Sequence, residues 1–309
     1  METISGNFKN SFNGYLSAVS EFKDNPDCLA SLHCGIISEH SREGTVSGRH
    51  TILRAAGLAL SGRRVFLTSV SDPMFIARGY EQIRAAICVP NLKVVLSSVH
   101  DGAELDHDGA VRQMNEDFAL MRVLPGIAVL SPSDGRSAYV LTRLLASSWE
   151  GPAYMRLSHS ETGGIYGGDD FDFSIGGARL LSEGDGVTIC AVGVMVKEAL
   201  IAGEILAAQG ISADIIDCYS IKPFAMQTLL ASVRRTGCCV TAEKHNNAGG
   251  LFGTISECLS RSYPVPAMCV SVDGRFGQSG TEGELREYYG LTHREIVHNA
   301  LQVWAIRRR

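Results

Sequence analysis

The chain has 309 residues and a mass of 33.2 kDa, a length that suggests two domains, each large enough for its own hydrophobic core. Apolar residues make up 45% and charged residues 20% of the sequence, which excludes an intrinsically disordered chain. The 28 basic and 33 acidic residues give a net charge of −5, which excludes nucleic-acid binding as the main activity because phosphate contacts require a basic surface.

The sequence contains no stretch of the roughly 18 consecutive apolar residues that a membrane helix needs, so we predict no membrane segment. The N-terminal residues lack the basic and apolar regions of a signal peptide. The nine cysteines include no CxxC motif, and their odd number argues against a disulfide framework. Together these features predict a cytoplasmic protein with reduced thiols.

Helical and strand patterns alternate through the first half of the chain. Apolar residues at helical spacing predict a first helix over 12–22. The predicted strands lie at 28–34, 64–70, 92–99, 127–130 and 153–157. The predicted helices between them lie at 51–60, 75–87, 115–123 and 135–147. This alternation predicts βαβ units and a mostly parallel sheet with helices on both faces.

A Gly- and Asp-rich stretch over 160–177 interrupts this alternation, and we place an interdomain linker at 166–175. We therefore expect one domain at 1–165 and a second at 176–309. The second half has predicted strands at 187–192, 213–217 and 238–242. Its predicted helices lie at 195–209, 226–235, 249–260, 282–289 and 294–304, the last of them preceded by the capping residue Thr292. The predicted fold class is α/β, with two three-layer αβα domains around mostly parallel sheets.

Polar segments follow the ends of four predicted strands in the first half. They come after Cys34, Val70, Val99 and Leu157. Because ligands of parallel sheets bind outside the carboxyl ends of the strands, we expect these segments to lie around one site.

The order of several short runs of residues resembles the C-terminal half of transketolases, and more closely the separate C-terminal subunit of transketolases that are split into two polypeptides. Each run is weak evidence alone, but they follow one another over nearly the whole chain. The runs are Ala55–Leu60, Tyr80–Arg84, Asp108–Ala110, Glu116–Arg122, Tyr154–Leu157, Glu243–His245, Gly249–Leu251 and Phe276–Thr281.

This resemblance implies a pyrimidine-binding domain followed by a transketolase C-terminal domain. It also implies thiamine diphosphate as a cofactor shared with an N-terminal subunit, and that this partner holds the diphosphate and Mg²⁺. Such sites lie between subunits, so we expect a heteromer, with α2β2 as the expected stoichiometry. The run Gly184-Asp185-Gly186 lacks the later asparagine of the diphosphate motif and is predicted to be a turn before a strand.

The glutamate that activates the cofactor in this family is missing. The family's glutamate binds the pyrimidine ring, shifts it to its imino form and so promotes deprotonation of the thiazolium carbon. It lies seven residues before Ala55, where this chain has Gly48. Three alternatives follow: Glu43 takes over after a displacement of its loop, His50 or water replaces the carboxylate, or the site is inactive.

The family also places aromatic side chains against the pyrimidine ring. Their positions correspond here to Ser71 and Met74, with Phe75 one residue away. A shift of one residue at Asp72-Pro73 would bring Phe75 onto the ring. The alternative is that Phe75 packs its helix against the core.

The segment 100–108 is the richest in titratable groups. The resemblance implies that His100 contacts the substrate and that Asp108 selects it, with His107 nearby. Arg112 occupies the position of a second family histidine that handles substrate protons. An arginine, with a pKa above about 12, cannot be a general base, but it can bind a carboxylate or phosphate. Proton transfer would then pass to His100, His107 or a partner group.

Arg156 lies near the end of the strand 153–157, where the resemblance implies an arginine for the substrate phosphate. Glu243 and His245 are interpreted as structural residues near the subunit interface. We predict no metal site in this chain, and a site among the His and Asp residues of 100–108 is the alternative.

The resemblance implies a transferase subunit that moves a two-carbon ketol or related acyl unit from a sugar phosphate or keto acid donor. The departures from the family at Gly48 and Arg112 suggest an altered substrate or step, as in a specialised pathway. One alternative is a catalytically inert scaffold or regulatory subunit that completes an active partner. Another is a subunit similar to a 2-oxo acid dehydrogenase β-chain or to a deoxyxylulose-phosphate synthase.

Overall fold

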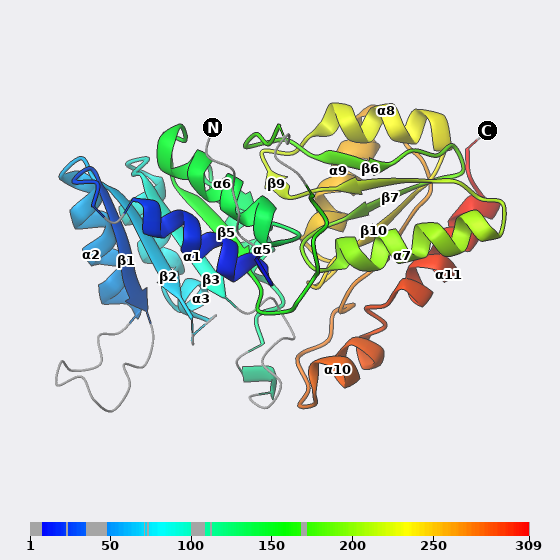
Figure 1. The fold of residues 1–309 in the computed structure, drawn as a ribbon. Helices are drawn as coiled ribbons and strands as arrows, with labels where there is room; N and C mark the ends of the chain where they lie inside the picture. Colours follow the sequence, from blue (N-terminus) through cyan, green and yellow to red (C-terminus); the bar gives the residue numbers. More distant parts are fainter. Residues whose placement is uncertain are drawn as a thin grey trace.

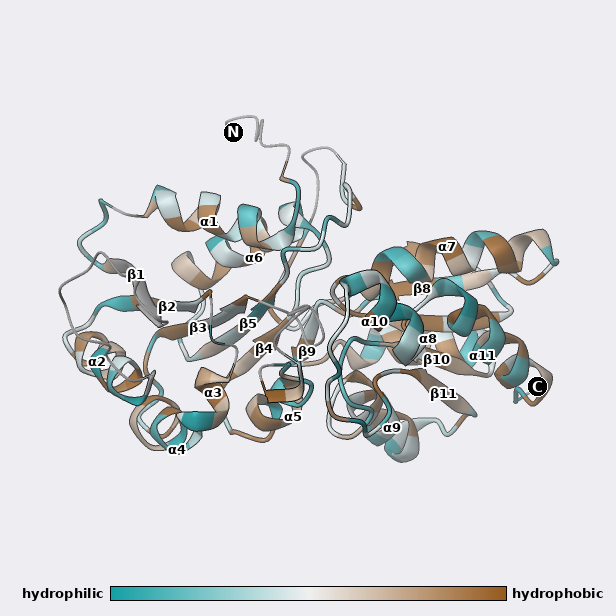
Figure 2. Ribbon diagram, turned by 90° about the horizontal axis from the view of Figure 1, so that it is seen from below, coloured by the Kyte–Doolittle hydropathy of each residue, from teal (hydrophilic) through white to brown (hydrophobic). Residues whose placement is uncertain are grey.

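The computed structural model describes residues 8–22, 24–34, 48–70, 72, 74–99, 109–111, 113–167 and 172–308, with the backbone alone for 29–34. Two β-sheets lie side by side, and helices cover both faces of each sheet (Figures 1 and 2). The α/β fold class with mostly parallel sheets is therefore confirmed.

The first sheet has the strand order β1-β2-β3-β5-β4-β9. Its strands are β1 (Cys28–Cys34), β2 (Arg64–Ser69), β3 (Val94–Val99), β4 (Ala128–Leu130), β5 (Ala153–Leu157) and β9 (Ser220–Lys222). Neighbouring strands pair in parallel, except that β9 pairs antiparallel with β4. Every residue of β2, β3 and β5 is buried, because helices cover both faces of the sheet.

Two helices, α1 (Ser11–Glu21) and α6 (Gly135–Ser147), pack together on one face of this sheet, above it in Figure 2. The opposite face carries α2 (Gly48–Leu60), α3 (Phe75–Arg78), α4 (Tyr80–Gln82), the π-helix η1 (Ile83–Cys88) and α5 (Asp117–Arg122). The short 3-10 helix η2 (Gly109–Val111) precedes α5. A reciprocal cap between Asp134 and Ser137 fixes the start of α6, which begins at the predicted residue.

The second sheet has the strand order β11-β10-β7-β8-β6. Its strands are β6 (Arg179–Ser182), β7 (Val187–Ala191), β8 (Ala213–Asp217), β10 (Cys239–Ala242) and β11 (Ala267–Val270), all parallel except β6. Its helices are α7 (Met195–Ala208), α8 (Met226–Thr236), α9 (Leu251–Ser262), α10 (Glu282–Tyr289) and α11 (His293–Ala305). Thr292 caps α11 as predicted, with its side chain accepting a hydrogen bond from Glu295 N.

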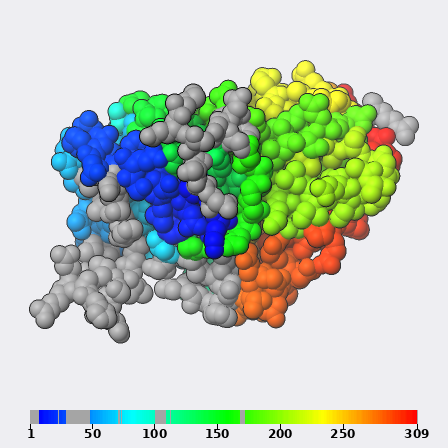
Figure 3. All heavy atoms as spheres, viewed as in Figure 1, coloured from blue at the N-terminus to red at the C-terminus, as the bar shows by residue number. Residues whose placement is uncertain are grey.

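One apolar cluster extends across both halves of the chain. It contains Phe75 and Leu96 from the first domain together with Leu229 and Ile255 from the second. On the face drawn in Figure 3, green atoms of the first domain meet yellow-green atoms of the second along a continuous boundary. The two domains therefore share buried surface as well as a connecting chain. Among the described residues, no helix has both the length and the apolar character to cross a membrane.

The single helix predicted over 75–87 is wrong. The segment is divided into α3, α4 and the π-helix η1, with Gly79 between the first two. A Cβ atom at Gly79 would lie 2.1 Å from Cδ1 of Ile52 and 3.0 Å from the carbonyl oxygen of Phe75, so the close approach of α2 favours a glycine at this point. The wider π turn keeps Ile83 and Ile87 completely buried.

Three strands were not predicted: β6, β9 and β11. Each has only three or four residues and lies at an edge of its sheet, so none forms a run long enough to be recognised as a strand. Their positions depend on partners that are distant in the sequence, which a local pattern does not contain.

Strand β9 comes from the second half of the chain but completes the first sheet. Ser131 N donates to Tyr219 O at 2.9 Å just before the β4–β9 pairing. Lys222 Nζ donates to Arg122 O at 2.9 Å and also to Leu124 O. The second domain therefore covers an edge of the first sheet that would otherwise be open.

This arrangement predicts that β9 stabilises both domains. Ile221 is 1% exposed and belongs to the shared apolar cluster, so Ile221→Ala should lower the free energy of unfolding by about 2–5 kcal/mol in urea denaturation. Leu60→Ala is the matched control, because this side chain is 71% exposed, and its effect should stay within about 0.5 kcal/mol. Equal losses for the two variants would contradict the role of β9.

Candidate active site at the domain junction

Six of the predicted site residues lie outside the described residues: Glu43, Ser71, His100, His107, Asp108 and Arg112. The other five are described. Gly48 is the first residue of α2, and His50 lies exposed in the first turn of the same helix. Gly48 has no side chain to offer, so the described part of this helix start presents no carboxylate at the family's glutamate position.

Phe75 and Met74 lie at the start of α3. The Phe75 side chain is completely buried in the shared apolar cluster, and Met74 packs against that cluster while partly exposed. This is the arrangement expected if Phe75 packs its helix. Its contact with a cofactor ring stays a prediction.

Arg156 lies in β5, and its side chain is only 3% exposed. Its guanidinium group binds both carboxylate oxygens of Asp117, with Nε to Oδ2 at 2.7 Å. Nη1 donates to the carbonyl oxygen of Lys244 at 2.8 Å. The guanidinium carbon also lies 3.8 Å from the centre of the Phe118 ring. A substrate phosphate on Arg156 would therefore have to compete with Asp117, and that assignment stays a prediction.

Asp117 is the first residue of α5 and is itself 2% exposed. Tyr154 donates its hydroxyl to Asp117 Oδ2 at 2.7 Å. Burial favours the neutral acid, but the neighbouring Arg156 guanidinium outweighs this effect and lowers the pKa of Asp117. A charged, fully bonded carboxylate thus holds the start of α5 against the end of β5.

Two residues that follow β10 complete this cluster from the second domain. The first of them, Glu243, accepts hydrogen bonds from Leu251 N at 2.7 Å and Phe252 N at 2.8 Å, so its carboxylate caps the start of α9. Burial raises the pKa of Glu243 to about 7, against the effect of these two donors. A Cβ atom at Gly250 would lie 2.1 Å from Glu243 Oε2, which explains the glycine beside this cap.

The second, His245, is completely buried, and its ring stacks on Phe118 with 5.0 Å between ring centres. Its Nδ1 lies 2.6 Å from Asn246 O, whereas Nε2 lies 3.7 Å from Asp117 Oδ1 and lacks a hydrogen-bond partner among the described residues. Burial lowers the pKa of His245 to about 4, so the imidazole is neutral near pH 7. This neutral ring fills the junction between the domains.

The residues of this cluster lie in runs that carry the family resemblance, but the sequence does not show that they contact one another. Asp117 lies within the run Glu116–Arg122, and Glu243 and His245 lie within another run that carries the resemblance. Sequence reasoning did not pair Asp117 with Arg156, because the two residues lie on separate elements of the fold. The structure joins these runs into one buried network of hydrogen bonds and rings.

A second buried carboxylate lies where the connecting segment crosses the junction. Asp217, at the end of β8, accepts hydrogen bonds from Ser133 at 2.5 Å and from the Tyr166 hydroxyl at 2.7 Å. Its Oδ1 lacks a hydrogen-bond partner among the described residues. Burial raises the pKa of Asp217 to about 7, and the nearby Asp134 carboxylate adds to this shift. The start of the predicted linker is therefore fixed at the junction.

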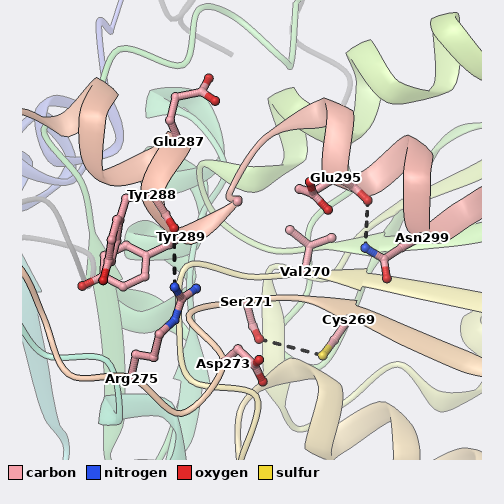
Figure 4. Close-up of a pocket in the computed structure, with 11 residues that line it drawn as sticks. Cys269, Val270, Ser271, Asp273, Arg275, Glu287, Tyr288, Tyr289, Glu295 and Asn299 are labelled. Atoms are coloured by element: carbon pink, nitrogen blue, oxygen red, sulfur yellow. Dashed lines mark hydrogen bonds between the residues drawn. The ribbon is translucent and has the colours of Figure 1, made fainter.

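Cavities open on the described surface at two places away from the buried cluster. One of about 420 Å³ lies between β11, α10 and α11, where Arg275 lies over the rings of Tyr288 and Tyr289 (Figure 4). Another of about 790 Å³ lies between α5, β9, α8 and α9 and contains Arg122, Lys222 and Phe224. Neither cavity contains a residue that the sequence predicts for the site.

The Gly184-Asp185-Gly186 run forms a turn before β7, as predicted. Asp185 Oδ1 accepts a hydrogen bond from the Ser212 hydroxyl at 2.7 Å, and Gly184 N donates to Asp214 at 2.8 Å. A Cβ atom at Gly184 would lie 2.4 Å from Ala213 N. Both polar groups bond to residues at the start of β8, which fits a structural role for this run.

Two family models match the chain in sequence order. Residues 45–164 match the model described as the transketolase pyrimidine binding domain, and residues 176–296 match the model described as the transketolase C-terminal domain.

The chain is similar to two named transketolase subunits. It is 38% identical over 253 residues to the 6-deoxy-6-sulfo-D-fructose transketolase subunit SqwH of Clostridium sp. (strain MSTE9), covering 81% of this chain and 76% of that protein. It is 32% identical over 248 residues to a subunit of the apulose-4-phosphate transketolase of Phocaeicola vulgatus, covering 80% of this chain and 78% of that protein.

A solved structure described as a split gene transketolase in an inactive beta4 tetramer matches with a TM-score of 0.85 and 32% identity. The match covers 98% of this chain and 100% of that chain.

The buried ion pair yields a prediction for stability. Asp117→Asn leaves the Arg156 charge buried without a counter-ion and should lower the free energy of unfolding by about 3–5 kcal/mol in urea denaturation. Glu287→Gln is the control, because its ion pair with Arg294 is exposed and should change stability by less than about 1 kcal/mol. A loss for Asp117→Asn no larger than the control would contradict this prediction.

Asp217 yields a prediction for pH dependence. Its pKa is about 7 in the folded chain and close to 3.8 when unfolded, so the folded state binds the proton more tightly. This contribution to stability is complete below about pH 4 and is lost as the pH rises through 7. Asp217→Asn should therefore flatten the decline of unfolding free energy between about pH 4 and pH 7, an effect of a few kcal/mol at most. The exposed Asp172→Asn variant should retain the wild-type slope.

Proposed function

The chain belongs to the transketolase family, and on this premise we propose that it is one subunit of a heteromeric, thiamine diphosphate-dependent transketolase-like transferase. The observation that carries the proposal is the match to a split gene transketolase over 98% of this chain and the whole of that chain. An N-terminal transketolase-like subunit is the partner that such a split enzyme needs.

The proposed reaction transfers a two-carbon ketol or related acyl unit from an anionic donor. The names of the two relatives above refer to a sulfonated and a phosphorylated sugar, which supports a donor that carries a strong acid group. Arg112, with His107, is proposed to bind this acid group, because guanidinium groups form paired hydrogen bonds with such oxyanions. Arg156 is proposed to join them by exchanging its bonds with Asp117 for the acid group. His100 and Asp108 are proposed to contact the reacting sugar chain.

Thiamine diphosphate supplies a carbanion equivalent at its thiazolium carbon when it is bound. The described residues do not by themselves fit its aminopyrimidine ring, because Gly48 has no side chain and the Phe75 ring is completely buried. We therefore assign no catalytic step through the cofactor to these residues. Glu43 and His50 remain the two proposed substitutes for the missing carboxylate, and Ser71 and Met74 the proposed contacts of the ring. A contact from Phe75 would require its ring to leave the apolar cluster.

The partner is also proposed to hold the diphosphate and Mg²⁺. The bond of the Asp185 carboxylate to Ser212, the residue before β8, supports this division. An α2β2 complex in the cytoplasm is the expected form, since each site would need one wall from each kind of subunit.

The proposed function predicts a loss of turnover in Asp108→Ala. The chain should be co-expressed with a transketolase-like subunit that carries the diphosphate motif, and ketol transfer from sulfonated, phosphorylated and carboxylated donors should be measured with thiamine diphosphate and Mg²⁺. We expect the complex to turn over and either subunit alone to be inactive. Asp108→Ala should reduce kcat/KM by at least about a hundredfold.

The exposed Asp172→Ala variant is the matched control and should keep the wild-type rate. Turnover that Asp108→Ala leaves unchanged would contradict the substrate assignment. A complex that forms but turns over none of these donors would favour the alternative of an inert scaffold.

A further inference from the structure

The larger of the two surface cavities, about 790 Å³ in volume, is formed by both domains. The first sheet contributes β9 and the helix α5 that packs against it, and the second domain contributes α8 and α9. This volume lies within the range of about 300–1,000 Å³ that small-molecule sites occupy. Among the described residues that line the cavity, none is assigned to the cofactor or to the sugar donor. The proposed function therefore gives this cavity no role.

Apolar side chains from both domains form part of the cavity wall. Ile221 and Phe224 lie in and just after β9, and Cys258 lies in α9. Val123, which follows α5, is 68% exposed, and Met226, the first residue of α8, is 38% exposed. These two exposed side chains come from different domains but border the same cavity. The hydrocarbon part of a ligand would cover both and remove their apolar surface from water.

Basic side chains outnumber acidic ones around the same cavity. Arg122, Lys222 and Arg261 line it, and Glu257 is the carboxylate among the described lining residues. Three basic groups and one acidic group give a local charge of +2, although the whole chain has a net charge of −5. Glu257 forms an ion pair with Arg122 at 2.5 Å. The charges of Lys222 and Arg261 therefore remain to attract an anion.

The ammonium group of Lys222 is held in place and keeps one donor in reserve. Its Nζ donates to Arg122 O at 2.9 Å and also to Leu124 O. An ammonium group has three N–H donors, so these two bonds leave one for a ligand. Burial lowers the pKa of Lys222, and the nearby Arg122 charge adds to this effect. An anion beside Nζ would offset both effects by stabilising the charged amine.

The other surface cavity, shown in Figure 4, has the opposite balance of charge. Its described lining contains three acidic residues, Asp273, Glu287 and Glu295, and the basic residue Arg275. This arginine already lies over two tyrosine rings. An anionic ligand should therefore favour the cavity between α5, β9, α8 and α9.

We propose that this larger cavity is a binding site for a small organic anion with an apolar body, such as a medium-chain carboxylate. The acid group binds Lys222 and Arg261, and the hydrocarbon part covers Val123 and Met226. A molecule bound here contacts both domains at once, so its binding stabilises their joined arrangement. The inference goes beyond the proposed function, because it concerns a separate site and no step of ketol transfer.

The test uses octanoate as the probe and measures its binding to the purified full-length chain by isothermal titration calorimetry. Octanoate should bind at one site with a Kd below about 1 mM. Octanamide has the same chain without the charge and should bind at least about tenfold more weakly. Inorganic phosphate has the charge without the apolar body and should give no binding heat.

Two variants change the cavity from opposite sides. Met226→Glu places a carboxylate on the apolar wall, at a helix start where an acidic residue is tolerated, and should weaken octanoate binding at least about tenfold. Met226→Leu keeps the apolar surface and should retain the wild-type Kd. Arg261→Gln removes one exposed charge and should weaken octanoate binding about three- to tenfold. This variant carries the test if Met226→Glu fails to fold.

The matched control is Leu60→Glu, which introduces the same charge at a position that is 71% exposed and does not line the cavity. Its Kd for octanoate should equal that of the wild type. A wild-type chain that does not bind octanoate, or binding that Arg261→Gln leaves unchanged, would overturn the inference. Equal affinities for octanoate and octanamide would also overturn it, because the basic residues would then contribute nothing.

The same titration with the complex of this chain and its transketolase-like partner decides between a ligand site and a subunit contact. We expect octanoate to bind the complex with the Kd of the free chain. Binding that disappears in the complex would overturn the inference, because the partner would then occupy the cavity. These measurements do not depend on turnover, so they are independent of whether the proposed ketol transfer is observed.

Discussion

The buried ion pair between Asp117 and Arg156 is the constraint on which the domain junction depends. A guanidinium group with 3% exposure is tolerated only when its charge and its N–H groups are satisfied, and here Asp117 and the Lys244 carbonyl satisfy them. These bonds fix the start of α5, the end of β5 and the loop after β10 relative to one another. The Phe118 ring, placed between Arg156 and His245, fills the remaining space. The carboxyl ends of the two sheets are thereby held together.

The longer helices and strands of both domains were predictable from the sequence, because their capping residues and apolar patterns match the burial that each element has in the fold. Residues 135–147, 153–157 and 213–217 have the predicted bounds, and each is marked by a cap or by a run of buried residues. The elements that the sequence did not predict, such as β9 and the break at Gly79, depend on neighbours that are remote in the chain. Short strands gain their stability from pairing, so their own residues carry little of the signal.

The candidate site shows a different limit. The sequence identifies residues of a suitable type, such as Arg156 and Phe75. It does not show which neighbouring groups already bind the Arg156 guanidinium or cover the Phe75 ring. In the fold, Arg156 is bound to Asp117 and the Phe75 ring lies within the core. The hydrogen-bonded pairing of Gln113 with Gln278 was not predictable from the sequence, because the two residues lie 165 positions apart. Such long-range hydrogen bonds are visible only once the topology is known.

The path of β9 restricts how a gene for this fold can be divided. A break between residues 167 and 172 would look like a natural boundary, yet the first fragment would lose the strand that covers β4. Its open edge would expose unpaired backbone groups, which favour aggregation between copies. The second fragment would carry a strand with no sheet to join. The two halves of this polypeptide are therefore poorly suited to being shuffled as independent modules.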